Sequence, residues 1–197
     1  MSKISENQKN KRANILDAAY ELFTSKSFKN TSIDDVVKKA GIAKGTFYLY
    51  FKDKHDLMER LIIRKSAVVF GDALTKLNER KKISQMDFSQ QIIFISEYII
   101  DFMQANKEII VLVQKKLSSC LSLFSQSSDF ENLRFEINQL LDENTSNGFS
   151  IDETKKRVYL VMELIGSVCY DSIIYESPFK IDEIKPFLFS SIEKIMI

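Results

Sequence analysis

The chain has 197 residues, of which 45% are apolar and 28% charged, and its formal net charge is +1. A chain of this length can bury a core in one domain and a small second one, and its composition argues against bulk disorder. The longest unbroken apolar runs, 109–113 and 158–162, are far shorter than the roughly 20 residues of a membrane-spanning helix. We therefore expect an ordered protein with no membrane partner.

The first residues, MSKISEN, lack the apolar segment of a secretory signal, and Cys120 and Cys169 have no close spacing and no histidine near them. We therefore expect a reduced, cytoplasmic protein with no disulfide, no metal site and no cofactor. Turn residues are scarce, since there are five Gly, and the two Pro, Pro178 and Pro186, lie close to the end of the sequence. Because Gly and Pro supply most turns of a sheet protein, their scarcity predicts an all-α fold with long helices.

The net charge is an average of two unlike halves. Residues 1–65 carry 14 Lys and Arg against 8 Asp and Glu, a net charge of +6. Residues 66–197 carry 14 against 19, a net charge of −5. This asymmetry predicts that the two halves meet different partners.

The first elements are predicted to be short. Residues 1–8 are polar and are expected to form a loose arm, and apolar residues at helical spacing follow in 15–23 and 33–40. Ser32 and Asp35 form a capping-box pattern at the start of the second segment, and Gly41 is a helix-ending residue directly after it. A third short segment, 44–51, is followed by Asp53, a candidate N-cap for the next helix.

Longer helices are predicted from there to the end. A helix from 54 to about 80, with about 27 residues, would be about 40 Å long. The others are expected at about 87–105, 107–126, 128–146, 151–175 and 181–196, which gives about nine helices in all. We expect residues 9–55 to form one domain and residues 56–197 a second.

Residues 31–54 have the pattern short helix, glycine turn, short helix, which is typical of a helix-turn-helix whose second helix enters the major groove of DNA. If Phe47 and Phe51 turn toward the core, Gly45 and Leu49 lie on the outermost face of that helix. The residues that flank this face are Lys44, Thr46, Tyr48 and Tyr50. Gly45 weakens a helix by about 0.5–1 kcal/mol relative to Ala, which indicates either a close approach of the backbone to DNA or local packing against the first helix.

Over about residues 10–60 the chain resembles the TetR family of bacterial helix-turn-helix transcriptional regulators. The resemblance depends on ILDAA and LF in 15–23, TSIDDV in 31–36, GIAKGTFYLYF in 41–51, and KDK with Leu57 in 52–57. It implies an N-terminal DNA-binding domain, joined by a long helix to a C-terminal domain that binds an effector and dimerises. It also implies a ligand-responsive repressor that binds a palindromic operator as a homodimer and is released by a small, largely apolar molecule.

The family pattern assigns DNA contacts to this chain residue by residue. Phosphate and DNA-backbone contacts are implied for Thr31, Ser32, Tyr48, Tyr50 and Lys54. Base and phosphate contacts are implied at the front of the second helix, for Lys44, Gly45 and Thr46, beside the exposed Leu49. Two positions depart from the family, because Ser27 replaces the usual glycine that ends the first helix and Ala43 replaces the usual Ser or Thr cap.

The C-terminal half is predicted to contain a dimer face. Residues 158–175 are apolar nearly all the way round a helix, and the last helix is also broadly apolar, so both need cover on more than one side. The family dimerises through its last two long helices, which implies a dimer interface at Ile165, Gly166, Cys169, Ile173, Phe187, Leu188 and Ile192. The alternative is that these are central core helices of a monomer.

The same half is rich in aromatic residues, and the resemblance implies that its helices enclose an effector pocket. The candidate lining residues are Phe70, Phe94, Tyr98, Phe102, Cys120, Phe124, Tyr159, Met162 and Glu163. The alternative is that these side chains are ordinary core, and that Glu163 and Asp171 lie at a rim or face solvent instead of anchoring a ligand.

Catalysis is not supported. His55 is the one histidine and lies beside the DNA-binding segment, and the sequence has no glycine-rich phosphate loop, metal-ligand spacing or nucleophile motif. The prediction is therefore a regulator that is not an enzyme. Two alternatives remain open: a DNA-binding regulator without a small-molecule effector, and an all-helical enzyme or carrier whose helix-turn-helix-like head is incidental.

Overall fold

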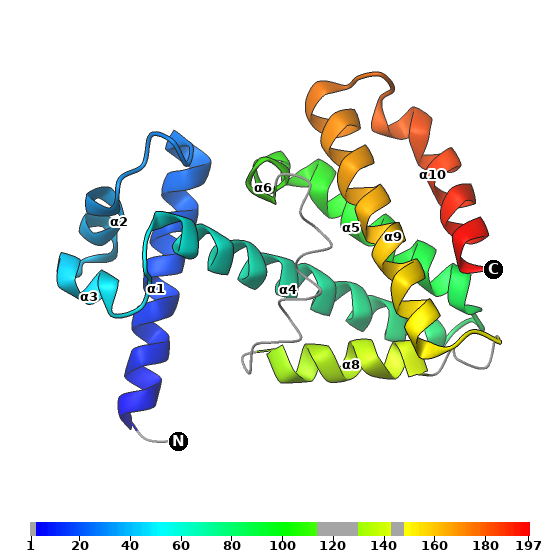
Figure 1. Ribbon diagram of the computed structural model, residues 1–197, viewed down its shortest axis with the longest axis horizontal. Helices are drawn as coiled ribbons and strands as arrows, with labels where there is room; N and C mark the ends of the chain where they lie inside the picture. Colours follow the sequence, from blue (N-terminus) through cyan, green and yellow to red (C-terminus); the bar gives the residue numbers. More distant parts are fainter. Residues whose placement is uncertain (1–2, 114–129, 143–147) are drawn as a thin grey trace. The chain divides into compact units, whose positions relative to one another are not determined.

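The computed structural model describes residues 3–113, 130–142 and 148–197, and within these ranges the chain is helical with no strand (Figure 1). The all-α prediction is confirmed. The chain divides into two compact units, Met1–Arg64 and Lys65–Ile197.

Unit 1 contains α1 (Lys3–Lys26), α2 (Ile33–Ala40), α3 (Lys44–Tyr48) and the first part of α4 (Lys54–Lys81). α2 packs against both α1 and α3 (Figure 1). The apolar stripe expected on the first helix is buried in the core of this unit: Ile15, Ala19, Leu22 and Phe23. The side-chain amide of Asn14 on α1 also donates to the Ala40 carbonyl at the end of α2, at 3.0 Å. These contacts hold α2 against α1.

The start of the chain differs from the prediction. The expected loose arm over residues 1–8 is wrong, because α1 begins at Lys3. No Gly or Pro interrupts 3–26, so nothing in the backbone stops the helix from extending toward the N-terminus. At the other end of α1, Ser27 has φ 72°, the left-handed conformation that favours glycine. Ser27 therefore adopts the conformation for which the family usually has a glycine.

The predicted caps are present. The Ser32 hydroxyl accepts from the Asp35 amide at 3.1 Å, and the Asp35 carboxylate accepts from the Ser32 amide at 2.9 Å. Gly41 ends α2 with φ 65°, whereas Ala43 begins α3 without a side-chain cap. The Asp53 carboxylate accepts from the amides of His55 and Asp56 at the start of α4.

The boundary between the two compact units lies inside α4, at 64/65. The first eleven residues of α4 belong to unit 1, where Leu57 and Leu61 are buried. Arg64 also forms an ion pair with Asp17 of α1 at 3.0 Å. The helix itself continues without a break to Lys81, close to the predicted end.

Unit 2 contains the rest of α4 and the later helices of the chain. They are α5 (Phe88–Ala105), α6 (Lys107–Val113), α8 (Glu131–Asp142), α9 (Ile151–Cys169), η3 (a π-helix, Tyr170–Tyr175) and α10 (Ile181–Met196). α10 packs against α5 and α9, and Lys185 of α10 lies 2.7 Å from Asp101 of α5. The predicted helix starts at 87, 107, 151 and 181 agree with these bounds, and the predicted ends at 126 and 146 lie outside the described residues.

One stretch of the described residues, Ile151–Tyr175, is long and apolar enough by length and composition to cross a membrane. A helix covered on both sides in a soluble protein passes the same test, so the finding is weak support for a membrane partner. This stretch is the one whose nearly continuous apolar surface led to the prediction of a dimer face.

Candidate nucleic-acid interface and internal cavity

α3 is held in place by two phenylalanines. Phe47 and Phe51 are almost completely buried, with ring centroids 5.6 Å apart. The exposed Tyr48 ring lies edge-on to Phe47, with centroids 5.3 Å apart. The predicted inward pair is therefore confirmed, and it determines which residues of α3 face outward.

The outward face of α3 is exposed as the helical periodicity indicated. Leu49, which caps the C-terminal end of the helix, is 81% exposed, and Gly45 and Tyr48 are also exposed. Thr46 and Tyr50 are half-buried. The surface offers a bare backbone, hydroxyl groups, one apolar side chain and the amine of Lys44.

Gly45 has no packing reason to be glycine. A Cβ placed on Gly45 meets no atom within 4 Å, and this residue is not among the glycines with positive φ. The alternative that Gly45 permits local packing against another helix is therefore not supported. A close approach of the backbone to a partner remains the physical reason for a glycine inside this helix.

Lys44 is paired with an acidic residue of α2. Its Nζ lies 2.8 Å from Oδ1 of Asp34, and this hydrogen bond raises the pKa of Lys44. The sequence pattern did not reveal this pair, because the two residues lie on different helices, ten positions apart along the chain.

Of the two predicted phosphate ligands at the start of α2, Thr31 is buried and Ser32 is exposed. Thr31 is 1% exposed, and its hydroxyl donates to the carbonyls of Ser27 (2.8 Å) and Leu22 (3.3 Å). The Thr31 side chain therefore joins α1 to the start of α2 and is not available to a phosphate in this structure. Ser32 is exposed, although its hydroxyl is engaged in the cap of α2.

Lys54 binds the turn between α1 and α2. Its Nζ donates to the carbonyls of Phe28 (2.8 Å) and Thr31 (2.9 Å) and lies 4.3 Å from the centre of the Phe28 ring. The exposed His55 also contacts Phe28, with ring centroids 5.1 Å apart. Lys54 therefore stabilises the turn that leads into Ser32.

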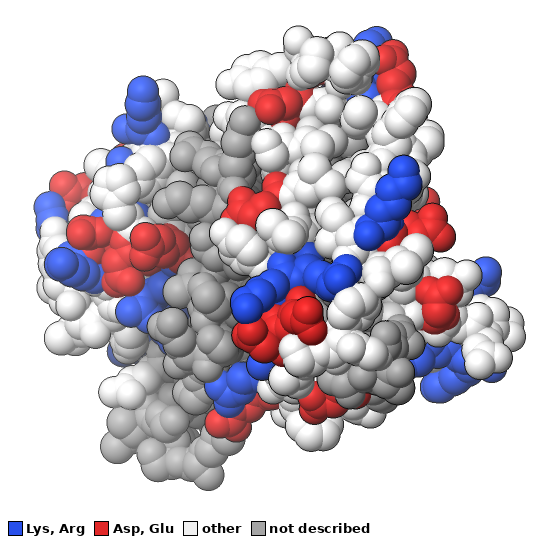
Figure 2. All heavy atoms as spheres, turned by 45° about the vertical axis from the view of Figure 1, so that its right-hand side comes forward, with Lys and Arg blue, Asp and Glu red and all other residues white. Residues whose placement is uncertain are grey.

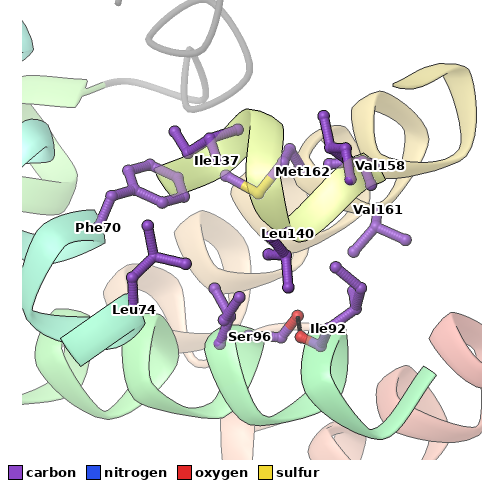
Figure 3. Close-up of a pocket in the computed structure, with 11 residues that line it drawn as sticks. Phe70, Leu74, Ile92, Ser96, Ile137, Leu140, Val158, Val161 and Met162 are labelled. Carbon is purple, nitrogen blue, oxygen red and sulfur yellow. Dashed lines mark hydrogen bonds between the residues drawn. The ribbon is translucent and has the colours of Figure 1, made fainter. Parts of the chain in front are cut away.

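Unit 2 encloses an apolar cavity of about 50 Å³ between α4, α5, α8 and α9 (Figure 3). Its walls are aliphatic and aromatic side chains together with Ser96, and the Ser96 hydroxyl already donates to the Ile92 carbonyl at 2.7 Å. Among the described residues, the lining consists of Phe70, Leu74, Ile92, Ile95, Ser96, Ile137, Leu140, Leu141, Val158, Val161 and Met162. The described lining residues offer a ligand no charge, and Ser96, the polar side chain among them, has already donated its hydroxyl proton.

Two of the predicted pocket residues, Phe70 and Met162, line this cavity. Phe94, Tyr98 and Phe102 are half-buried on α5 and do not line it. Cys120 and Phe124 lie outside the described residues. The aliphatic lining from α5 and α8 was missed, and no sequence signal distinguishes it from ordinary core.

The two remaining pocket candidates lie on another face of α9. Tyr159 is exposed, and a hydrogen bond to the Glu163 carboxylate raises the pKa of the Tyr159 phenol. Neither side chain lines the cavity. Asp171 is half-buried in η3 and is also absent from the lining.

The predicted dimer residues are mostly buried within their own chain. Phe187 is 71% exposed, but the others have little or no exposed surface: Ile165, Gly166, Cys169, Ile173, Leu188 and Ile192. Burial raises the pKa of the Cys169 thiol to about 12, so this thiol is unreactive at neutral pH. The exposed apolar side chains of α9, η3 and α10 are instead Ile151, Tyr159, Leu160, Tyr175 and Phe187. Figure 2 brings the α9 and α10 side of unit 2 forward and shows uncharged atoms over much of it.

Among the described residues, no three His, Cys, Asp or Glu side chains gather as a metal site. The two features with functional character are therefore the exposed face of α3 and the apolar cavity of unit 2.

Comparison with known proteins identifies relatives of the N-terminal region. The family described as "Bacterial regulatory proteins, tetR family" matches residues 15–61. The uncharacterized HTH-type transcriptional regulator YvdT of Bacillus subtilis (strain 168) is 54% identical over 44 residues, 22% of this chain and 23% of that protein. The fatty acid metabolism regulator protein of the same organism is 27% identical over 127 residues, 64% of this chain and 58% of that protein. The matches span less than two thirds of either relative's length.

A solved structure extends the likeness along the chain. The transcriptional regulator FadR from Bacillus subtilis, in complex with stearoyl-CoA, has a TM-score of 0.53 and 17% sequence identity, covering 91% of this chain and 96% of that one. At this identity the likeness shows a shared fold, an N-terminal helix-turn-helix followed by further helices.

Proposed function

Because this chain belongs to the TetR family of bacterial regulatory proteins, we propose that it is a cytoplasmic repressor that binds double-stranded operator DNA through α3. The observation that carries the proposal is the exposed face of α3, with Gly45 unobstructed and Lys44, Tyr48 and Leu49 around it. Lys44 and Tyr48 would contact phosphates, and Thr46 and Tyr50 would lie at the margins of the contact. Leu49 suits an apolar contact such as a thymine methyl group.

Selection of bound duplexes from random DNA tests this function directly. On a selected duplex, Lys44→Ala and Tyr48→Ala should weaken binding, and Lys44→Ala should reduce the slope of log Kd against log salt by about 0.9. Lys76→Ala is the matched control, because Lys76 is a similarly exposed lysine of unit 2 that lies 3.0 Å from Glu79. Selection that enriches no duplex would refute DNA binding and favour a helical enzyme or carrier.

The protein is further proposed to act as a homodimer on a palindromic operator. The last two long helices, α9 and α10, pack against each other and expose Leu160 and Phe187, which are 54% and 71% exposed. Large apolar side chains on two neighbouring helices are typical of a surface that is covered by a partner, here a second copy related by two-fold symmetry.

Sedimentation equilibrium at micromolar concentration should therefore give a dimer. Leu160→Asp and Phe187→Asp should each shift the protein toward monomer. Ile83→Asp is the control, because Ile83 is 81% exposed but lies outside α9 and α10 and should leave the dimer intact. A monomeric wild-type protein would contradict the dimer and the palindromic operator together.

The effector is proposed to be a molecule whose buried part is hydrocarbon. In the part of the chain that the structure describes, every lining group of the cavity is apolar except Ser96, whose hydroxyl proton is already donated to the Ile92 carbonyl, so a charged or strongly polar ligand group would lose its water contacts with little replacement. The related FadR structure contains stearoyl-CoA, which is one molecule with such a part. Because Phe70 and Leu74 of the wall belong to α4, a ligand that displaces them acts on the helix that begins at Lys54.

The volume of the cavity favours a second candidate, a regulator without a small-molecule effector. About 50 Å³ is well below the roughly 300–1,000 Å³ of most ligand pockets, so a long chain enters only if the helices part. A series of saturated fatty acids and acyl-CoAs of increasing length separates the two candidates. An effector site predicts DNA release that strengthens by about 0.8 kcal/mol for each buried CH₂.

Val158→Phe, which fills the cavity, should abolish that release without abolishing DNA binding. Val68→Phe is the control, because Val68 is an exposed residue of α4. Release that does not depend on chain length or on Val158, or no release at all, would favour the candidate without an effector.

A further inference from the structure

Lys44, at the start of α3, is held by an acidic side chain of the preceding helix. The Nζ of Lys44 lies 2.8 Å from Oδ1 of Asp34, and the two side chains are 54% and 69% exposed. Because Lys44 belongs to the face of α3 that is proposed to meet DNA, Asp34 places a negative charge directly beside that face.

Asp34 is not part of the cap of α2. The two reciprocal hydrogen bonds of the capping box are made by Ser32 and Asp35. Asp34 belongs to the first turn only as a further acidic residue, and its carboxylate oxygen contacts Lys44 on α3. Replacement of Asp34 by Asn therefore leaves the hydrogen bonds that begin the helix in place.

We propose that Asp34 competes with DNA for Lys44, so that DNA binding exchanges the Lys44–Asp34 ion pair for a contact between Lys44 and a phosphate. This inference rests on the proposed DNA-binding function. An ion pair between two exposed side chains is weak and is exchanged readily, whereas a lysine that reaches a phosphate of duplex DNA releases a condensed counterion. The carboxylate that remains beside the phosphates is then repelled by them.

The competition has a consequence for overall affinity. The Lys44–Asp34 pair must break on every duplex, whatever its sequence, so Asp34 lowers affinity for specific and non-specific DNA alike. The ratio of the two affinities is set by the contacts of α3 with base edges and is not changed by Asp34. Asp34 therefore reduces the amount of protein held on non-specific DNA at a given concentration by the same factor as it weakens specific binding.

A double-mutant cycle tests the exchange. Asp34→Asn, Lys44→Ala and the double variant are compared with the wild type by fluorescence anisotropy on a labelled selected duplex and a random-sequence duplex of equal length, over a salt series. Asp34→Asn should tighten binding to both duplexes by up to about fivefold at low salt, the range expected for an exposed ion pair. In the Lys44→Ala background the same change should have a clearly smaller effect. Glu21→Gln is the control, because Glu21 forms an ion pair with Lys39 in the same unit, between α1 and α2, and neither residue belongs to α3.

Three results would overturn the inference in different ways. Weaker binding by Asp34→Asn would mean that Asp34 positions Lys44 for DNA. Equal tightening with and without Lys44 would mean that Asp34 acts only as a general negative charge. If the wild type binds no selected duplex, the proposed function itself is refuted. This result concerns the wild type alone, whereas the other two concern the variants.

Discussion

A substitution of Lys54 can distinguish a structural role of this residue from a direct contact with DNA. The family resemblance assigns it a phosphate, whereas its ammonium donates two hydrogen bonds, of 2.8 Å to the Phe28 carbonyl and 2.9 Å to the Thr31 carbonyl. The same ammonium lies 4.3 Å from the centre of the Phe28 ring. Lys54→Met keeps an unbranched apolar stem of nearly the same length, with sulfur in place of Cδ, and removes the ammonium, so its effects report on these contacts.

The expected loss of stability follows from the three contacts. Hydrogen bonds to a charged group contribute about 1.5–3 kcal/mol each, and a partly exposed cation–π contact about 0.5–1 kcal/mol. Lys54 is half-buried, so water replaces part of what the two carbonyls lose. Lys54→Met should therefore lower the free energy of unfolding by about 2–3 kcal/mol, measured by urea denaturation followed by far-ultraviolet circular dichroism. Lys52→Met, at an exposed neighbouring lysine, should change it by less than about 0.5 kcal/mol.

DNA binding by the folded Lys54→Met protein completes the comparison. If Lys54 acts by holding the turn before Ser32, affinity falls but the slope of log Kd against log salt stays at the wild-type value. If Lys54 is itself a phosphate ligand, the slope decreases by about 0.9. A variant as stable as Lys52→Met with a reduced salt slope would refute the structural role.

Three further predictions concern the helix-turn-helix. Gly45→Ala should stabilise the fold by about 0.5–1 kcal/mol, because a Cβ at this position meets no atom within 4 Å. The same substitution should weaken DNA binding about tenfold or more, and an unchanged affinity in the anisotropy assay would contradict a close approach of the backbone to DNA. Phe47→Ala should lower the free energy of unfolding by about 3–5 kcal/mol, because the Phe47 ring is fully buried, whereas Tyr48→Ala should lower it by under about 1 kcal/mol. Both variants should bind DNA more weakly, and chemical denaturation separates the two causes. Hydrogen bonds from the side chain and backbone of Ser32 lower the pKa of Asp35 below its usual 3.8. These hydrogen bonds therefore stabilise the folded protein fully above pH 3.8, and the stabilisation is lost as the pH falls through the lowered pKa of Asp35 in the folded state. The urea midpoint of Asp35→Asn should therefore vary less between pH 2 and about 5 than that of the wild type, and parallel curves would contradict this.

Features decided within a few residues were predictable from the sequence. The capping box of Ser32 and Asp35 and the left-handed Gly41 need only their neighbours in the chain, and both are present. The helical periodicity of α3 likewise placed Phe47 inside and Leu49 outside, because the helix geometry and one buried residue determine every other direction.

Features that depend on distant partners were not predictable. Lys54 donates to carbonyls 23 and 26 positions away. The buried Thr31 hydroxyl donates to the carbonyls of Leu22, on α1, and of Ser27, directly after α1. A basic or hydroxylated side chain beside a DNA-binding helix has the same sequence signature whether it meets a phosphate or a carbonyl of its own chain.

The cavity shows the same limit for apolar residues. The sequence directed attention to aromatic side chains, but apart from Phe70 the walls are aliphatic residues, Met162 and Ser96. A void forms where α4, α5, α8 and α9 fail to fill the space between them, and this depends on their relative placement. Phe94 and Ile95 are neighbours in the chain, yet only Ile95 lines the cavity, because successive residues of a helix point about 100° apart.

The apolar residues of α9 show why a nearly all-apolar helix misled the choice of interface. α9 packs against α5, α8 and α10, and this packing uses Ile165 and Cys169 for the core of the chain's own unit. Leu160 belongs to the same apolar segment but is 54% exposed. Periodicity counts these residues as equal, since it records that a side chain is apolar and not which neighbour covers it. A second copy can cover only what the first copy leaves exposed, so Leu160 and Phe187, rather than Ile165 and Cys169, are the positions where a charge should separate a dimer without unfolding its subunits.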